Sequence, residues 1–470
     1  MLKNSCWRWI ACGLIAAIFG TACNGQTDPR MVNDITQLNP IKVRDIVAPK
    51  TLTELVQAVK THTGPISIGG GRFSMGGQTA TENALQIDMS SYNQVLQFSK
   101  KDREITVQAG MTWRKLIQFI DQYDLSVKIM QTYANFTVGG SLSVNVHGRY
   151  IGQGPIILSV KTIKVVMANG EVCLASPTSN SDIFYAAIGG YGGIGVIAEV
   201  CLSLTENCKI ERKTQLMAIG KYRQYFMDSI RNHEGLIFHN ADIFPDDYQQ
   251  VRAISYVKTS KPLTITDRLK PNDQSYFFDQ QAAELIAAHP FGKSLRKAVD
   301  PFFYRNEVVE WRNYEATYDV AQLEPSSRKH ITYVLQEYFV PIANFDSFYP
   351  KMAKILRQNK VNVMNVSIRH AKQDPGSMLA WAKTEVFAFV IYYRQGTSAA
   401  EREKVKHWTR QLIDAAIALK GSYYLPYQIH ATPAQFRKAY PGVDRFFDVK
   451  RKYDPTYKFR NKLFDAYYPD

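Results

Sequence analysis

A run of glycines near the amino terminus has the chemistry to bind phosphate through its backbone. Gly69–Gly71 stand together after a short apolar stretch, and Arg72–Ser74 follow directly. Consecutive glycines let several N–H groups point at one anion, because no side chain stands in the way. The run is neither a Rossmann fingerprint, since no G-x-G-x-x-G opens a helix, nor a Walker loop, since no G-K-[ST] follows. By itself it indicates either a phosphate-binding nest or a flexible turn.

Two further glycine-rich segments lie downstream. Residues 135–148 read N-F-T-V-G-G-S-L-S-V-N-V-H-G, and residues 188–200 read I-G-G-Y-G-G-I-G-V-I-A-E-V. Each segment adjoins a strand-like apolar run, as the first does. Three such segments spread over about 130 residues predict one large, elongated ligand that is contacted mainly by backbone groups.

The residues between these segments must form the elements that position them. Residues 51–60 have the pattern of an amphipathic helix with Thr51 as its N-cap. Residues 65–68 and 104–109 are predicted strands, and each leads directly into glycine. Residues 163–174 predict a hairpin around an Asn-Gly turn. Helices and strands mixed in this order indicate an α+β fold.

Five motifs occur in order between residues 40 and 205: G-G-G-R-F-S, I-D-M, V-Q-A-G, T-V-G-G-S-L-S-V-N-V-H-G and F-Y-A-A-I-G-G-Y-G-G-I-G-V-I. Together they resemble the PCMH-type FAD-binding domain of the vanillyl-alcohol-oxidase superfamily. That superfamily includes sugar-lactone and alditol oxidases, cytokinin dehydrogenases and the decaprenylphosphoryl ribose oxidase. The resemblance implies an α+β protein in which a two-subdomain FAD-binding domain is covered by an α+β substrate domain, and the C-terminal segment returns to the FAD domain.

The resemblance also implies a division of the chain. We expect a signal peptide at 1–23, a spacer at 24–40, the FAD-binding domain at 41–205, the substrate domain at 206–425 and the returning segment at 426–470.

FAD is the cofactor that the resemblance implies, with its pyrophosphate on the first glycine loop. Many relatives have a histidine directly after the first glycines that bonds covalently to the flavin, whereas this chain has Arg72. Guanidinium is a poor nucleophile and stays charged, so we predict non-covalent FAD and an Arg72 that pairs with phosphate or carboxylate. The expected cofactor contacts are Gly69, Gly70, Gly71, Arg72, Phe73, Ser74, Thr137, Gly139, Gly140, Ser141, Asn145, His147, Gly148, Gly195, Val196, Ile197 and Asn461.

The catalytic candidates come from the same resemblance. Residues 333–341 are similar to the E-Y-x-x-P strand of the aldonolactone oxidases, and a later strand carries Ser367 and Arg369 where those oxidases have a glutamate and an arginine. Alternation along a strand places these two side chains on one face. Where sugar oxidases have a lysine near the C-terminus, this chain offers other polar residues. The candidates are Arg369, Tyr427, Gln428, His147 and His430, with the two histidines as alternative bases and packing or structural roles as the competing interpretation.

These residues predict an FAD-dependent oxidoreductase that transfers hydride from the C–H of an alcohol, sugar derivative or lactone to flavin. Its partners are then a small-molecule substrate and either oxygen or another electron acceptor. Two alternatives stay open: a flavin-binding protein without turnover, and an amine-oxidising enzyme like the cytokinin dehydrogenases. The Y-L-P motif at 424–426 is closer to that of the cytokinin dehydrogenases.

The amino terminus has the pattern of an export signal. Lys3 and Arg8 precede the apolar stretch 9–19, and small residues lead to Cys23. This resembles a lipobox, although Gly20 stands where that motif usually has leucine. We therefore expect an exported, periplasmic protein, and three alternatives stay open: a lipidated Cys23 that anchors it to the membrane, ordinary cleavage nearby, or an uncleaved anchor.

Composition excludes several classes. Hydrophobic residues make up 45% of the 470, which is typical of a globular protein rather than a disordered one. The net charge of +15 favours an anionic partner, but there is no nucleic-acid-binding signature, so we expect no nucleic acid. After the leader only Cys173, Cys201 and Cys208 remain, without paired metal spacing, and we expect no metal site.

Overall fold

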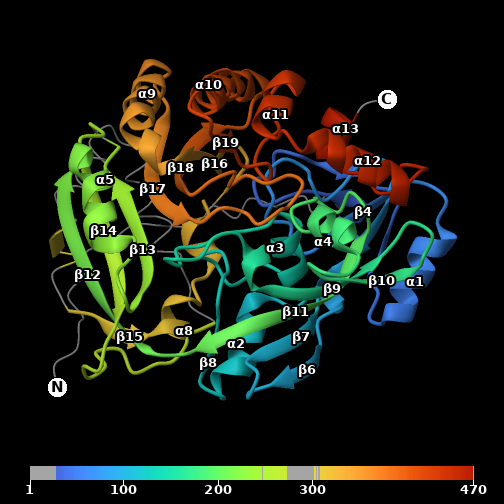
Figure 1. Cartoon of the computed structure of the whole chain (residues 1–470). Coiled ribbons are helices and arrows are strands. Elements are labelled where there is room, and N and C mark those ends of the chain that lie inside the picture. The colour runs from blue at the N-terminus through green and yellow to red at the C-terminus, as the bar shows by residue number, and fades with distance from the viewer. Residues whose placement is uncertain are drawn as a thin grey trace, which may run out of the picture.

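The computed structural model describes residues 28–245, 247–272, 301–302, 304, 307–325 and 327–468. The expected signal peptide and Cys23 lie outside these residues. Three sheets of three, six and eight strands dominate the described chain, together with the short pair β1 (Met31–Val32) and β2 (Ile41–Lys42) (Figure 1). Within the described residues, no helix combines the length and the apolar character that a membrane span needs.

The three-stranded sheet is parallel and carries the first glycine loop. Its order is β3 (Asp45–Val47), β5 (Leu85–Asp88) and β4 (Ile66–Gly69). Helix α1 (Leu52–Thr61) begins where predicted, because the Thr51 side chain accepts a hydrogen bond from the Glu54 backbone N–H. The loop starts where β4 ends, so the strand holds one end of it in place.

The six-stranded sheet forms the second half of the FAD-binding part. Its order is β10-β9-β11-β7-β6, and β8 pairs with β11. The strands are β6 (Val95–Ser99), β7 (Glu104–Gln108), β8 (Leu125–Val127), β9 (Val160–Val166), β10 (Val172–Ala175) and β11 (Val196–Glu206). The helices inserted between them are α2 (Trp113–Asp121), α3 (Val138–Ser143) and α4 (Ser181–Ala187). The second glycine segment therefore contains α3, and the third glycine segment leads into β11.

The eight-stranded sheet is antiparallel and follows after a change of sheet between β11 and β12. Its order is β15-β12-β14-β13-β17-β18-β16-β19. The strands are β12 (Lys209–Ala218), β13 (Leu236–Ile243), β14 (Gln250–Lys258), β15 (Val309–Trp311), β16 (Ile331–Pro341), β17 (Asn362–Ala371), β18 (Val386–Gly396) and β19 (Ser422–Tyr423). The associated helices are α5 (Tyr222–Tyr225), α8 (Arg312–Glu315), α9 (Phe345–Gln358) and α10 (Ala399–Ala418).

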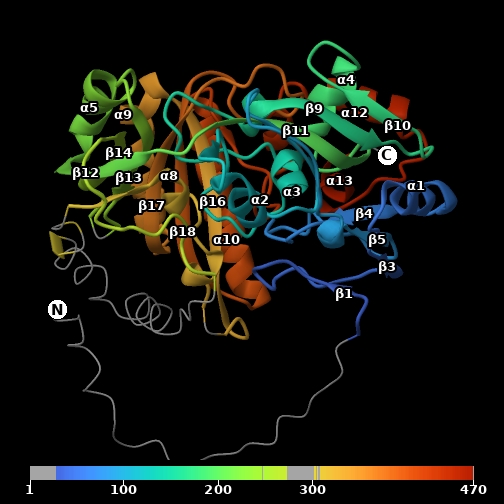
Figure 2. The same cartoon turned by 90° about the horizontal axis from the view of Figure 1, so that it is seen from below.

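Helix α9 covers one face of this sheet and leaves the other free for the site. Phe345 and Phe348 of α9 lie against Phe389 of β18, with ring centroids 5.6 Å and 4.8 Å away. Side chains alternate along a strand, so Val390, the next residue of β18, faces the opposite side. The two views place α1 and the three-stranded sheet at one end of the molecule and β12 at the other (Figures 1 and 2).

The C-terminal segment returns to the FAD-binding part. Its helices are α11 (Pro433–Ala439), α12 (Val443–Tyr453) and α13 (Lys462–Tyr467). Phe459 forms a parallel bridge with Ile66, and the buried Lys450 ammonium donates 2.6 Å and 2.8 Å hydrogen bonds to the Gly193 and Phe459 carbonyls. Together with the sheets, this return confirms the predicted α+β fold class.

Candidate functional site

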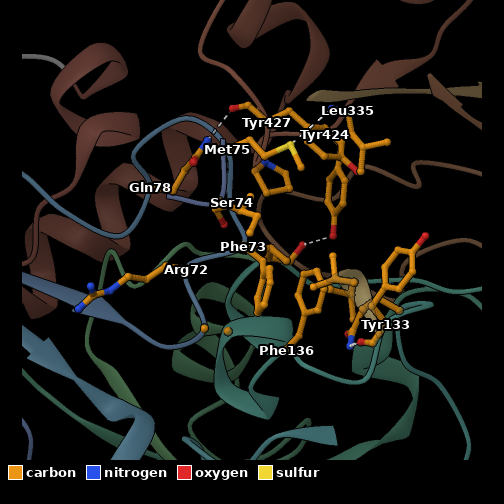
Figure 3. A pocket seen from close by; sticks show the side chains of 18 of the residues that line it. Arg72, Phe73, Ser74, Met75, Gln78, Tyr133, Phe136, Leu335, Tyr424 and Tyr427 are labelled. Atoms are coloured by element: carbon orange, nitrogen blue, oxygen red, sulfur yellow. Dashed lines mark hydrogen bonds between the residues drawn. The ribbon is translucent and has the colours of Figure 1, made fainter. Parts of the chain in front are cut away.

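A cavity of about 550 Å³ lies between the two parts of the molecule. Three sets of residues line it: the glycine segments, the free face of β16, β17 and β18, and the chain at Tyr424, Pro426 and Tyr427. Figure 3 shows the tyrosines of the C-terminal segment on one side, and Phe73 and Phe136 on the other. One wall of the cavity is therefore mainly backbone, and the other wall carries polar side chains.

The first glycine loop needs glycine because two loops meet there. A Cβ on Gly70 would come within 2.3 Å of the Thr137 hydroxyl, and one on Gly71 within 2.6 Å of the Phe73 ring. Arg72 has a left-handed φ of 57°, and its guanidinium pairs with Asp88 at 3.3 Å. Figure 3 shows this side chain pointing away from the Phe73 ring. Arg72 is thus held by a carboxylate, one of the two partners expected for it.

The second glycine segment forms the start of α3. Thr137 caps this helix by accepting a 3.3 Å hydrogen bond from the Gly140 N–H. A Cβ on Gly139 would lie 2.7 Å from the Ala109 side chain, which explains the absence of a larger residue. Phe136, just before the cap, stacks on Phe73 with ring centroids 4.2 Å apart. The two loops are therefore fixed against each other.

Two buried asparagines, Asn461 and Asn145, lie outside the lining of the cavity. Asn461 caps α13 through its side-chain oxygen and donates a 2.8 Å hydrogen bond to the Tyr191 carbonyl of the third glycine segment. Asn145 donates to Asp374 at 2.7 Å and to Ser377 at 3.1 Å. Neither lines the cavity. They tie the glycine segments to distant parts of the chain.

The structure brings most of the expected cofactor residues together. Those that line the cavity are Gly69, Gly70, Gly71, Arg72, Phe73, Ser74, Thr137, Gly139, Gly140, His147, Gly195 and Ile197. Those that do not are Ser141, Asn145, Gly148, Val196 and Asn461. Ser141 is instead buried in a network, where it receives a 2.8 Å hydrogen bond from the Trp113 indole and donates one to Gln131.

The catalytic candidates divide in the same way. Arg369, Tyr427 and His147 line the cavity, whereas Gln428 and His430 do not. The Gln428 amide donates to the Met75 carbonyl and so joins the C-terminal segment to the first glycine loop. Burial, reinforced by nearby Arg402, Lys406 and Arg410, lowers the pKa of His430 to about 3. The structure therefore gives no support to His430 as the base of this cavity.

Sequence reasoning missed Glu337, the carboxylate of the polar surface. It lines the cavity from β16, and its side chain is only 3% exposed. His147 Nε2 lies 2.6 Å from its Oε1, and the Tyr427 hydroxyl donates to its Oε2 at 3.2 Å. Burial and the Glu337 charge raise the pKa of Tyr427 well above its ordinary value, which keeps the phenol protonated. The strand motif at 333–341 was the available signal, but it did not reveal these partners.

Arg369 and Ser367 share the cavity face, as alternation along the strand predicts. The Arg369 Nε and the hydroxyl of Thr132, another cavity residue, are buried and have no hydrogen-bond partner within the described chain. Unpaired buried polar atoms are costly, and a bound polar ligand would satisfy them. The backbone-lined end and these polar atoms therefore fit an elongated dinucleotide with a substrate beside it.

Comparisons with known proteins agree with this geometry. Residues 44–176 match the model of the FAD binding domain family. The chain is 29% identical over 170 residues to cytokinin dehydrogenase 1 of Arabidopsis thaliana, covering 36% of this chain and 29% of that protein. It is 22% identical over 407 residues to the L-gulonolactone oxidase of Bos taurus, covering 84% and 87%. Against the cytokinin dehydrogenases of Arabidopsis and rice, the chain spans about a third of their length or less.

A solved structure supports the fold over nearly the whole chain. A variant of cholesterol oxidase from Brevibacterium sterolicum superimposes with a TM-score of 0.71 at 12% identity, covering 94% of this chain and 97% of that one. The site and the fold together define a flavoprotein with a PCMH-type FAD-binding domain. Residues 44–176 therefore match a known FAD-binding domain, and the chain is similar to FAD-linked oxidases and dehydrogenases, which confirms the resemblance and the predicted cofactor.

Proposed function

We propose that this protein is an FAD-dependent oxidoreductase that oxidises a CH–OH donor, namely an alcohol, a sugar derivative or a lactone. The observation that carries the proposal is the joining, in one cavity, of the three glycine segments with Glu337, Arg369 and Tyr427. The names of an L-gulonolactone oxidase, an L-galactono-1,4-lactone dehydrogenase and a cholesterol oxidase among its relatives support this donor class.

FAD would be held by the glycine segments and supplies hydride acceptance. The first loop, from Gly69 to Ser74, and the α3 segment offer backbone N–H groups to the diphosphate. Attachment is non-covalent in this proposal, because the first loop carries arginine where many relatives have histidine. Among the residues lining the cavity the one histidine is His147, and its Nε2 is engaged by Glu337.

The chain's own polar groups would orient the substrate and handle its charge. Arg369 lines the cavity with an unpartnered Nε, and a guanidinium there stabilises negative charge that develops on the substrate oxygen. Tyr427 presents a phenol that stays protonated and can hydrogen-bond the same oxygen. Tyr392 and Asn365, which are paired across β18 and β17, line the neighbouring part of the cavity and would help to set substrate shape.

An absorption spectrum of the purified protein tests the cofactor first. Flavin bands that move into the supernatant after acid precipitation support non-covalent FAD, whereas bands that stay with the pellet contradict it. Anaerobic mixing with L-gulono-1,4-lactone, L-galactono-1,4-lactone, alditols, simple alcohols and a sterol then tests the donor class. Bleaching by one of these supports the proposal. Bleaching only by an N6-alkyl adenine would instead indicate a cytokinin-type amine donor, and no bleaching would favour flavin binding without turnover.

The electron acceptor and location belong to the same proposal. Oxygen consumption with a bleaching donor distinguishes an oxidase from a dehydrogenase that needs another acceptor. We also propose export, with lipidation at Cys23, on the pattern of residues 1–23. Labelling with radioactive palmitate in wild type and in Cys23→Ser tests the anchor. Label in both proteins, or in neither, contradicts lipidation at this cysteine.

A further inference from the structure

Glu337 places a carboxylate at the edge of the cavity. It is buried, it lines the cavity, and both carboxylate oxygens already receive hydrogen bonds. The Tyr427 hydroxyl donates to Oε2, and His147 lies at Oε1. A buried carboxylate is stable only when paired in this way. Both carboxylate oxygens are therefore satisfied at the edge of the cavity.

The sheet register relates Glu337 to Ser367. Glu337 of β16 is opposite Val390 of β18, and Val390 is opposite Ser367 of β17. All three line the cavity and share one face. Adjacent strands are about 4.8 Å apart, so the two outer residues are separated by about 10 Å along one row. Glu337 thus lies two strands away from Ser367, which stands where the aldonolactone oxidases that this strand resembles have a glutamate.

The His147 ring is arranged to balance this charge. Its Nε2 is 2.6 Å from Glu337 Oε1, and its Nδ1 is 3.4 Å from the Gly148 carbonyl oxygen. Both ring nitrogens therefore face oxygen acceptors. A proton held between the imidazole and the carboxylate satisfies these contacts, while Tyr427 occupies the remaining carboxylate oxygen. The Tyr427 phenol is the member of this group that is not fully buried, so it is the one best placed to meet a substrate.

We propose that Glu337 accepts the proton of the substrate hydroxyl through the Tyr427 phenol, with His147 as the positioning residue that holds the carboxylate. The inference rests on the proposed CH–OH oxidation. The substrate O–H bond breaks and its proton passes to Tyr427 Oη, while the Tyr427 proton passes to Glu337 Oε2. The electron pair left on oxygen forms the carbonyl bond as the carbon loses its hydride to bound FAD, so charge and electrons balance.

Several charged and titratable groups face this carboxylate from different elements. They are His147 after α3, Tyr191 of the third glycine segment, Tyr424 after β19, Tyr427 of the C-terminal segment and Tyr440 after α11, while Arg369 of β17 acts on Tyr427. Burial first, and the Glu337 charge in addition, raise the pKa of Tyr191, Tyr424 and Tyr440 well above the ordinary value. These phenols stay protonated, so they do not compete with Glu337 for the proton.

Glu337→Gln tests the proposal in the holoenzyme. With a donor that bleaches the wild-type flavin, we expect flavin reduction to slow by at least about 100-fold, with FAD content retained, since general-base catalysis contributes factors of that size. We expect the rate to fall at acidic pH in wild type and not in the variant. Glu385→Gln is the matched control, because Glu385 pairs with His370 at 2.7 Å and does not line the cavity. It should change the rate less than about twofold.

Moving the carboxylate to a neighbouring strand tests whether its position in the cavity sets the reaction rate. In Glu337→Gln combined with Ser367→Glu, the negative charge returns to the same row two strands away. We expect the rate to stay within about twofold of Glu337→Gln alone, because a carboxylate about 10 Å along the row does not take the place of Glu337 at the Tyr427 hydroxyl, and a recovery of about tenfold or more would contradict the path through the phenol. A wild-type rate in Glu337→Gln, or an unchanged pH profile, overturns the inference while leaving the proposed function intact. Failure of every donor to bleach wild-type flavin instead overturns the proposed function.

A stability measurement adds a readout that does not depend on turnover. Glu337→Gln, Tyr427→Phe and the double variant of the full chain are compared by urea unfolding. If the 3.2 Å hydrogen bond joins the two side chains, the double variant should shift the midpoint no further than the more damaging single variant. Shifts that simply add would show that the phenol and the carboxylate act independently, and would remove the proton path.

Discussion

Two buried histidines each hold a glutamate at nearly the same distance, but in different surroundings. His147 and Glu337 lie 2.6 Å apart, with both side chains 3% exposed, against the cavity. His370 and Glu385 lie 2.7 Å apart outside the cavity lining, and the Glu385 side chain is 25% exposed and also bound by Arg231. The hydrogen bond from His370, together with Arg231, lowers the pKa of Glu385 to about 2.

The comparison shows that the neighbours of a histidine–glutamate pair decide what it can do. Hydrogen bonds from His370 and from the Arg231 guanidinium favour the anionic form of Glu385, so this pair serves to join β17 to the start of β18. Glu337 is bound by an imidazole and a phenol, both of which can exchange protons, and it borders a ligand-sized cavity. Of the two pairs, only the one beside the cavity has the surroundings for proton transfer.

The largest expected effect on the rate of flavin reduction comes from replacing Tyr427, the third residue at the His147–Glu337 pair. The corresponding residue at the His370–Glu385 pair is Arg231. Tyr427→Phe should slow flavin reduction by about 100-fold with FAD retained, because it removes the proposed path to Glu337. Arg231→Ala, the matching change at the other pair, should leave the reduction rate within about twofold and lower stability. Stopped-flow absorbance of flavin reduction measures both. An equal loss of reduction rate in the two variants would contradict the difference proposed between the two histidine–glutamate pairs.

Arg369, one of the arginines that line the cavity, should have the next largest effect. Arg369→Ala removes a guanidinium whose Nε has no hydrogen-bond partner among the residues that the structure describes, and we expect flavin reduction to slow by about 30-fold while FAD stays bound. Arg369→Lys should recover part of this loss, because the charge remains but the planar donor set does not. Unchanged reduction kinetics in Arg369→Ala would remove this residue from the active site.

Replacing the two histidines in the same way sharpens the comparison. His147→Gln should lower the reduction rate by about tenfold, since the amide can hydrogen-bond Glu337 but cannot carry a proton for it. His370→Gln should leave that rate unchanged and lower the thermal midpoint. The two variants are measured side by side, by stopped flow and by thermal unfolding. A larger rate loss in His370→Gln than in His147→Gln would contradict the assignment.

The smallest expected effect is on the free energy of unfolding at acidic pH, and it concerns the His370–Glu385 pair. The folded pKa of Glu385 is about 2, below the ordinary 4.5, so its stabilisation is fully present above about pH 4.5 and is lost as the pH falls towards 2. Partial exposure limits this contribution to about 1 kcal/mol. Between pH 4.5 and 2, wild type should therefore lose about that much more unfolding free energy than Glu385→Gln, as measured by urea titration. Parallel loss in the two proteins would rule out this contribution.

Local patterns were enough to predict the cofactor end of the site. Thr51 caps α1 as expected, the hairpin of β9 and β10 forms around its Asn-Gly turn, and glycines stand where a Cβ would collide. Alternation along a strand also placed Ser367 and Arg369 together on the cavity face. These features depend on residues close in sequence, whose geometry follows from backbone sterics.

The catalytic end was not predictable in the same way. His430 is three residues from Tyr427, yet only the tyrosine lines the cavity, because the backbone turns between them and the Gln428 amide binds the Met75 carbonyl. Glu337 and His147 are 190 residues apart in the chain and meet through packing between the FAD-binding part and the eight-stranded sheet. No spacing rule within one segment predicts a contact of that kind.

The amino-acid sequence by itself determined the α+β class and three segments suited to a large, elongated ligand, because glycine placement and side-chain periodicity act locally. FAD itself followed from the resemblance of the ordered motifs to a known family. Only the tertiary structure decided which carboxylate borders the cavity, which histidine accompanies it and which candidates lie elsewhere. The reason is that burial and counter-charge depend on neighbours brought from distant parts of the chain, and these set the proton chemistry of a side chain.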